Sequence, residues 1–330
     1  MATDEIKVFA GSSGINFARK ICNYLDVKLG RSEVITFSEG NTFVKVKETV
    51  RDKDVYLIQS IGLNPNTEFV EILFWLDAFK RASAASVTAI IPYYGYAKGD
   101  KKDEPRVSIR ARVCAECIEL AGADRVVTMD LHSPQIQGFF KKPVDHLLAM
   151  PLLCEYVKSL NIDDLVVVAP DAGFAKQARK YGSYLDCPVA IGDKARKSHN
   201  EKAELLEIIG DVADKNVLIV DDFSISGRTI VNLADLLKKK KAKRIIASLS
   251  HVLLDDEGME RLEESPVELL ICTDSVDNKH IINNPMVKIL SVAPLFAEAI
   301  TRINSRVSVS TLFKAVPDSV FTSSVPEDRG

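Results

Sequence analysis

The sequence predicts an α/β protein built from two similar domains, each with a mostly parallel sheet flanked by helices. Apolar runs rich in β-branched residues alternate with helical stretches along the chain, a pattern typical of parallel sheets with helices on both faces. The length of 330 residues exceeds one comfortable core and fits two domains. The two halves also share an order of elements, which indicates a duplication.

The expected elements follow from these runs in chain order. Strands are expected at Lys7–Ala10, Val55–Gln59, Val87–Ile91, Arg125–Met129, Leu165–Ala169, Val189–Ile191, Val217–Val220, Arg244–Leu249, Val267–Cys272 and Val287–Ser291. Helices are expected at Ile15–Leu25, Thr67–Ala82, Ile109–Leu120, Pro151–Ser159, Phe174–Tyr181, Thr229–Lys239 and Leu295–Asn304. Binding sites in such sheets lie at the carboxyl ends of the strands.

The repeated unit is a strand, a loop, a helix and a second strand. One copy begins at Asp54 and the other at Asn216, with similar spacing. Where the second copy has Asp221-Asp222, the first has Gln59-Ser60. The first copy therefore lacks the paired acids and is expected to have another task.

The expected domains are residues 1–146 and 147–316, followed by a polar tail, 317–330, that is expected to be disordered. Pro143 and Pro151 flank the expected connector. The four lysines from Lys238 to Lys241 close a helix, and a solvated helix end explains them better than a nucleic-acid patch.

Composition argues against several classes of protein. Lys and Arg total 43 against 46 Asp and Glu, so no strong positive field recruits nucleic acid. No apolar run has the length of a membrane span, and the amino terminus has no signal-peptide pattern. The cysteines are scattered. We interpret Cys114 and Cys117 as reduced packing thiols on a helix rather than a redox or metal pair, and we expect a cytoplasmic protein.

The strongest motif runs from Val217 to Ile230. A buried-strand pattern is followed by Asp221-Asp222, then by a turn with hydroxyls and a glycine, and then by an apolar helix. Acids at a strand's carboxyl end can accept bonds from ribose hydroxyls, and a turn leading into a helix amino terminus can donate to a phosphate. An ordinary N-cap and loop is the alternative explanation.

Three weaker candidates also follow strands. His132 is placed to contact a metal or a polyphosphate, or simply to cap and pack. Asp171 precedes a glycine and a helix, so it suits magnesium or an N-cap equally. Lys194 and Arg196 begin a polar segment that we interpret as a mobile loop, which either closes over a phosphate-rich substrate or is merely solvated.

A fourth candidate is the segment from Pro92 to Arg106. It mixes aromatics, glycines and cations, and it can clamp a nucleotide with charge from Lys98. Its balanced acids argue against DNA or RNA binding.

Together these segments resemble one family, the ribose-phosphate pyrophosphokinases (PRPP synthetases). The likeness is carried by Phe9–Ser13, Tyr96–Asp103, Met129–Phe140, Pro170–Gly173, the acid pair and Ser308–Ser310. The His132 segment is highly specific to this family, whereas phosphoribosyltransferases in general share the acid pair. The resemblance implies two tandem phosphoribosyltransferase-like (type I) domains, with ribose 5-phosphate in the second and ATP mainly against the first, helped by a neighbouring subunit.

The resemblance also implies a role for each matching residue. Ribose hydroxyls would be held by Asp221 and Asp222, and the 5-phosphate would be surrounded by Ile225, Ser226, Gly227, Arg228 and Thr229. The catalytic residues would be Lys194 and Arg196, Mg²⁺ would contact His132 and Asp171, and ATP would contact Phe37, Glu39, Asn41, Lys98, Gly99 and His132. The effectors phosphate and ADP would bind at Arg51, Arg106, Ser308, Val309 and Ser310. The family's dimers assemble into a hexamer, which sets the expected homo-oligomer.

The implied reaction moves the β,γ-pyrophosphoryl group of Mg-ATP to the anomeric hydroxyl of ribose 5-phosphate. Such a transfer needs alignment and charge neutralisation more than a protein nucleophile. Two alternatives remain: a catalytically silent regulatory subunit, and a phosphoribosyltransferase that consumes PRPP. The chain departs from the best-known class of the family at Ile225 and Arg228 in the phosphate loop, at Lys98-Gly99, and around Glu39 and Asn41.

Overall fold

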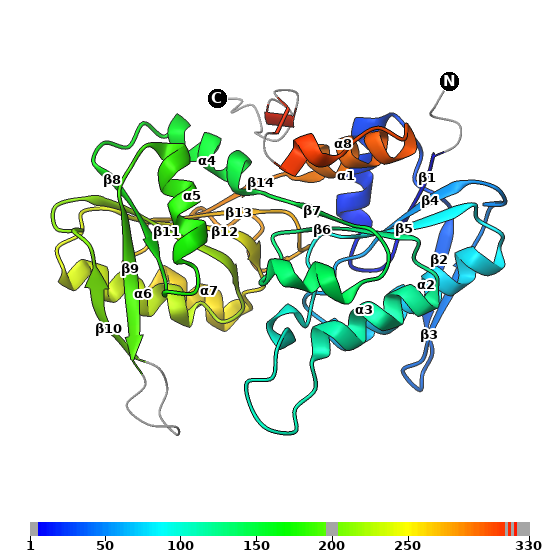
Figure 1. Ribbon diagram of the computed structural model, residues 1–330, viewed down its shortest axis with the longest axis horizontal. Coiled ribbons are helices and arrows are strands. Elements are labelled where there is room, and N and C mark those ends of the chain that lie inside the picture. The colour runs from blue at the N-terminus through cyan, green and yellow to red at the C-terminus, as the bar shows by residue number, and fades with distance from the viewer. Residues whose placement is uncertain (1–5, 196–203, 314–315, 318–319, 322–330) are drawn as a thin grey trace. The chain divides into compact units, whose positions relative to one another are not determined.

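The computed structural model describes residues 6–195, 204–313, 316–317 and 320–321 (Figure 1). The chain forms two compact units. Unit 1 comprises Met1–Leu148, Asp274–Asp277 and Ser291–Gly330, and unit 2 comprises Ala149–Thr273 and Asn278–Leu290. This division differs from the expected domains, because two carboxyl-terminal segments belong to unit 1. Most of the expected 317–330 tail lies outside the described residues.

Unit 1 is built on a five-stranded parallel sheet of order β1-β4-β5-β6-β7, accompanied by the separate hairpin β2-β3. Its elements are β1 (Ile6–Ala10), α1 (Ile15–Leu25), β2 (Ser32–Thr36), β3 (Thr42–Val46), β4 (Asp54–Ile58), α2 (Pro65–Arg81), β5 (Ser86–Ile91), η1 (Ala97–Gly99), α3 (Arg110–Ala121), β6 (Arg125–Met129), η2 (Pro134–Phe139), β7 (Val144–Leu147), α8 (Ala293–Asn304) and η3 (Ser310–Phe313).

The core of unit 1 is rich in aromatic side chains. Trp75 and Phe79, one helical turn apart on α2, stack at 5.7 Å, and Phe9 of β1 lies 4.9 Å from Phe79. Helix α8 joins this unit because its apolar face packs on α1, where Phe17 and Phe296 meet edge to face at 5.4 Å. This packing explains why the carboxyl-terminal helix lies outside the unit expected from chain order.

Unit 2 is built on a seven-stranded sheet of order β10-β9-β8-β11-β12-β13-β14, in which only the β10–β9 pair is antiparallel. Its elements are α4 (Met150–Ser159), β8 (Leu165–Ala169), α5 (Ala175–Leu185), β9 (Val189–Ala195), β10 (Glu204–Ile209), β11 (Asn216–Ser224), α6 (Arg228–Lys239), β12 (Ile245–Val252), α7 (Asp256–Glu263), β13 (Leu269–Thr273) and β14 (Val287–Leu290).

The centre of unit 2 follows from its apolar pattern. β11 pairs with β8 on one side and β12 on the other, so the run from Val217 to Val220 is fully buried. Helix α6 covers it with Ile230, Leu233, Ala234 and Leu237, whose helical spacing places them on one face.

The two units repeat one topology. The strands β8-β11-β12-β13-β14 of unit 2 occur in the same order as β1-β4-β5-β6-β7 of unit 1, so β11 and α6 correspond to β4 and α2. This internal likeness agrees with the duplication that the sequence predicts. Unit 2 adds β9 and β10 at one edge.

Several elements differ from those expected. The hairpin β2–β3, the strands β7 and β10, and helix α7 were not among the predicted elements. All six cysteines are free thiols, and Cys114 is buried on α3, as predicted for packing residues. Within the described part of the chain, no helix combines the length and the apolar character needed to cross a membrane.

Candidate functional site

The acid pair lies within a strand rather than after one. β11 was expected to end at Val220, but it continues to Ser224 because β12 supplies backbone partners as far as Ser224↔Val252. On the other side the register with β8 ends at Ile219↔Val168. The acids therefore project from β11 beyond the end of β8, at the edge where parallel sheets bind ligands.

The two acids are desolvated and close to a third. Asp222 is buried, and its Oδ1 accepts the Phe223 amide at 2.8 Å, while Oδ1 of Asp221 accepts the Asp222 amide at 3.0 Å. Burial raises the pKa of Asp221 well above its usual value, and the charges of Asp222 and then Asp171 raise it further. A cation or several hydroxyl donors would relieve this repulsion, so the arrangement suits such a partner.

Asp171 has a structural contact as well. Its Oδ1 accepts the amide of Phe174 at 3.2 Å, just before α5 begins at Ala175. The side chain thus stabilises the turn before α5, and its charge contributes to the raised pKa of Asp221. The structure brings Asp171 and the acid pair together in unit 2.

The loop from Ile225 to Thr229 provides amide groups next to the acids. Gly227 adopts φ +73°, a conformation that favours glycine, and directly precedes α6. No side chain caps the α6 amino terminus, and the Gly227 amide makes a long 3.2 Å bond to Ser224 Oγ. Ile225, Ser226 and Arg228 are exposed. Free amides at a helix amino terminus suit an oxyanion.

The structure adds a residue that the sequence analysis missed. Arg261 of α7 donates from Nη1 to the Ser226 carbonyl and from Nη2 to Glu257. No local pattern marks Arg261, because it lies 35 residues from Ser226 along the chain.

In unit 1 the amides of the corresponding loop donate to a glutamate of the same unit. Glu68 on α2 accepts the Gly62 amide at 2.5 Å and the Asn64 amide at 3.1 Å. It is only 5% exposed, and burial raises its pKa despite those two bonds. Its counterpart is Ile230, because the buried positions of α2 and α6 match with Glu68 in the place of Ile230. In unit 1 a side chain of the unit itself thus accepts from the amides of this loop.

A second buried glutamate of α2, Glu71, accepts hydrogen bonds from neighbouring donors in the same way. Glu71 accepts from Trp75 Nε1 at 3.1 Å, from the Ser12 amide at 2.8 Å and from the Ser12 hydroxyl at 2.5 Å. Gln59, in the place of Asp221, accepts the Ser13 amide at 3.2 Å. The amino-terminal copy is therefore satisfied internally and has no ligand-ready acid pair.

The nucleotide candidates lie on three segments of unit 1. Three candidates form the tip of the β2–β3 hairpin: Phe37, Glu39 and Asn41. There the Phe37 amide donates to the Asn41 carbonyl at 2.8 Å, and residue Phe37 is 46% exposed. The short helix η1 carries an exposed Lys98 beside the buried Gly99.

The third segment is the loop after β6, which holds an exposed His132. Nε2 of His146 on β7 accepts the amide of Leu131 at 2.9 Å and so anchors this loop. The sequence analysis left His146 unassigned, and only the β6–β7 pairing reveals its role.

The remaining candidates are also placed. The backbone of Lys194 pairs with Leu205, so the strand predicted to end at Ile191 continues to Ala195 and the expected mobile loop is wrong at Lys194. The antiparallel partner β10 accounts for the extension. Arg196 lies outside the described residues.

The effector candidates are spread over unit 1. Arg51 and Arg106 are exposed. Ser308 and Ser310 are bonded to each other through their hydroxyls at 2.7 Å, with Val309 between them. The carbonyl of Ser308 accepts from Arg302 of α8 at 3.2 Å, which ties this segment to the helix.

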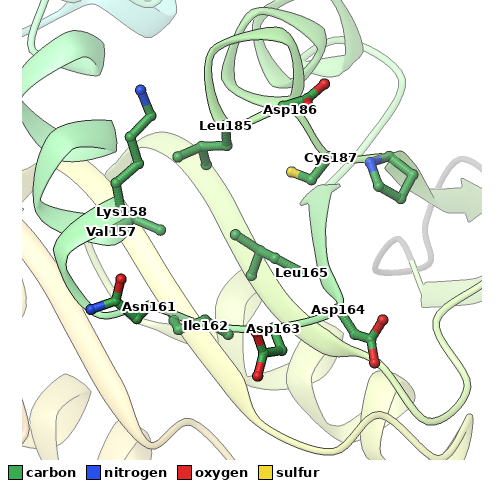
Figure 2. Close-up of a pocket in the computed structure, with 11 residues that line it drawn as sticks. Val157, Lys158, Asn161, Ile162, Asp163, Asp164, Leu165, Leu185, Asp186 and Cys187 are labelled. Atoms are coloured by element: carbon green, nitrogen blue, oxygen red, sulfur yellow. The ribbon is translucent and has the colours of Figure 1, made fainter.

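One cavity, of about 530 Å³, lies elsewhere in unit 2. Figure 2 shows Leu165, at the start of β8, and Cys187, just before β9, facing it. It therefore occupies the amino ends of these strands, away from Asp171 and the acid pair. Its lining includes three aspartates: Asp163, Asp164 and Asp186.

Comparisons with known proteins agree with this geometry. A family model described as the N-terminal domain of ribose phosphate pyrophosphokinase matches residues 6–122, and one described as the phosphoribosyl synthetase-associated domain matches residues 196–314. A ribose-phosphate pyrophosphokinase of Clostridium tetani is 44% identical over 93% of this chain and 97% of its own length. The chain belongs to the ribose-phosphate pyrophosphokinase family.

Further relatives of this chain agree with it in sequence and in fold. The enzyme of Caldanaerobacter subterraneus is 46% identical over 94% of this chain and 98% of its own. The crystal structure of phosphoribosylpyrophosphate synthetase from Mycobacterium smegmatis superposes with a TM-score of 0.86 at 36% identity, covering 92% of this chain and 99% of that one. The predicted family and fold class are confirmed.

Proposed function

We propose that this family member transfers the β,γ-pyrophosphoryl group of Mg-ATP to the anomeric hydroxyl of ribose 5-phosphate, forming PRPP and AMP. The observation that carries the proposal is the acid pair beside an uncapped loop in unit 2, in a chain that matches named pyrophosphokinases over nearly its whole length. Asp221 and Asp222 accept bonds from the ribose hydroxyls. The amides and hydroxyls of residues 225–229 bind the 5-phosphate.

The carboxylates of unit 2 fit magnesium as a partner. Among the described residues no group of three or more His, Cys, Asp or Glu side chains forms a ready metal cluster. Magnesium often takes only one or two carboxylates and completes its shell with water and substrate phosphates. The raised pKa of Asp221 is consistent with a cation nearby when substrate is bound. Asp171 is the candidate ligand in unit 2 and His132 in unit 1, and the ion would neutralise phosphate charge.

The other roles are proposed from the family likeness. Lys194 and Arg196 stabilise charge in the transition state. Phe37, Glu39, Asn41, Lys98, Gly99 and His132 contact ATP, while Arg51, Arg106 and Ser308–Ser310 bind phosphate or ADP as effectors. We also propose a hexamer assembled from dimers, acting in the cytoplasm.

The decisive assay follows phosphorus NMR of the protein with magnesium, ATP and ribose 5-phosphate. Formation of AMP together with a pyrophosphorylated sugar is expected, and Asp222→Asn is expected to abolish it. If neither product forms, with or without added phosphate, the catalytic proposal fails and the silent-subunit alternative gains support. Release of pyrophosphate from supplied PRPP and a base would instead favour a phosphoribosyltransferase.

A further inference from the structure

Helix α7 lies directly behind the loop proposed to bind phosphate. A β-carbon placed on Gly227 would lie 3.2 Å from the Gly258 carbonyl oxygen and 3.6 Å from Leu254, so the two backbones approach closely. The Leu253 amide also donates to the Ser224 carbonyl at 2.8 Å. The loop therefore rests on α7 and on the turn that precedes it.

Arg261 makes the directed contact between them. Its guanidinium donates to the Ser226 carbonyl through one terminal nitrogen and to Glu257 through the other, which fixes the plane of the group. The Arg261 side chain is 25% exposed and that of Glu257 is 72% exposed. The arginine is thus largely enclosed, whereas its carboxylate partner faces solvent.

This contact determines which way one peptide group faces. In a trans peptide the carbonyl of one residue and the N–H of the next point in opposite directions. Because Arg261 draws the Ser226 carbonyl towards α7, the Gly227 N–H points away from α7 and into the loop, where it meets Ser224 Oγ. Without that hold the peptide could turn, since glycine tolerates either sign of φ, and would present a carbonyl oxygen to the phosphate.

The support behind Arg261 is itself well fixed. Asp255 caps α7 by accepting the Gly258 amide at 2.9 Å. Asn278, 1% exposed, donates to the Leu254 carbonyl at 2.8 Å, and Nδ1 of His280 contacts Asp256 at 2.6 Å. The arginine therefore acts from a rigid base.

We propose that Arg261 is a positioning residue that holds the Ser226–Gly227 peptide with its N–H directed into the loop, where an oxyanion would replace the long bond to Ser224 Oγ. This inference rests on the proposed binding of ribose 5-phosphate at residues 225–229. Arg261 need not touch the sugar phosphate, since it acts through the orientation of one peptide. Its loss should weaken affinity for the sugar phosphate selectively.

Calorimetry with ribose 5-phosphate and steady-state kinetics would test the proposal on the full-length protein. Arg261→Ala should raise the Kd and KM for ribose 5-phosphate about tenfold, the effect of losing one hydrogen bond to a charged group. The KM for ATP and the melting temperature should change little. Arg261→Lys should lose less, because it keeps one donor. Glu257→Gln is the matched control and should stay within about twofold, because Glu257 is exposed.

Added guanidinium gives a further check. At about 20 mM, against sodium chloride of equal strength, guanidinium should recover much of the lost affinity of Arg261→Ala by refilling the space. Unchanged affinity in both arginine variants would overturn the inference, as would equal losses in ATP KM, affinity and melting temperature without rescue. If wild type itself does not bind ribose 5-phosphate, the proposed function fails instead.

Discussion

Replacing Glu68 by valine should destabilise unit 1 by about 1–3 kcal/mol. Valine is apolar and β-branched like Ile230, the residue at the corresponding position of α6, so the change gives α2 a side chain similar to that of its counterpart. Glu68 accepts the amides of Gly62 and Asn64 and is only 5% exposed. A buried donor left without an acceptor costs about 1–3 kcal/mol, and the cost here is smaller for each amide, because Gly62 is half-buried and Asn64 is exposed.

Two effects reduce the total below the sum for two donors. Burial raises the pKa of Glu68, which means that its charged form is held at some expense in the folded protein. The valine also gains some apolar burial. The estimate of about 1–3 kcal/mol allows for both effects and corresponds to a fall in melting temperature of roughly 2–12 °C at this size.

Chemical denaturation and calorimetry of wild type, Glu68→Val and Glu68→Gln would measure the effect. The glutamine keeps a carbonyl oxygen for one amide, so its loss should be intermediate. Calorimetric affinity for ribose 5-phosphate should remain within about twofold, because the proposed sugar site lies in unit 2. This readout separates a structural carboxylate in unit 1 from a role in binding the sugar.

The difference in unfolding free energy between wild type and Glu68→Val should depend on pH in a direction that can be checked. A carboxyl whose pKa is higher in the folded than in the unfolded state favours folding below about 4.5 and loses that contribution as pH rises through its folded pKa. The stability gap between wild type and Glu68→Val should therefore shrink from acid to neutral pH. A gap that widens, or a variant as stable as wild type throughout, would refute the explanation.

Three further substitutions test unit 2. Asp221→Asn should raise the free energy of unfolding at neutral pH, because the pKa of Asp221 is raised in the folded protein. The gain should fade as the pH drops and the wild-type acid protonates. Affinity for ribose 5-phosphate, measured by calorimetry, should fall about 10–100-fold. Gly227→Ala should cost about 1–2 kcal/mol in urea unfolding and weaken the same affinity, since φ is +73° and the added carbon approaches Gly258. Lys194→Ala should lower kcat far more than ribose 5-phosphate affinity; weaker binding with unchanged kcat would contradict its catalytic role.

The predictable part of the molecule was encoded locally. The buried run of β11, the acids after it and the helix that follows all lie within Val217–Lys239, so their spacing in sequence carried the prediction. The substitution of Gln59-Ser60 for the acids was visible for the same reason. What the sequence could not reveal was that Glu68 and Glu71 fill the first copy, since Glu71 meets Ser12 from 59 residues away.

The missed elements depend on partners distant in sequence. β10 exists as a strand because β9 pairs with it, and β11 gains Asp221–Ser224 because β12 continues alongside. Helix α7, mostly polar, buries only Gly258, Met259 and Leu262 and so lacks a strong apolar period. Arg261 gains its position from that helix, which is why no motif identified it.

The central claim is that the pyrophosphoryl group is transferred to a sugar oxygen, and isotope labelling of that oxygen tests it most directly. Ribose 5-phosphate labelled with ¹⁸O at the anomeric hydroxyl is incubated with Mg-ATP and the protein, and phosphorus NMR locates the label. Attack at the β-phosphorus predicts ¹⁸O in the bridge between the sugar and its new pyrophosphate, with unlabelled AMP as the other product. Label in AMP, or a sugar monophosphoryl product with ADP, would contradict it.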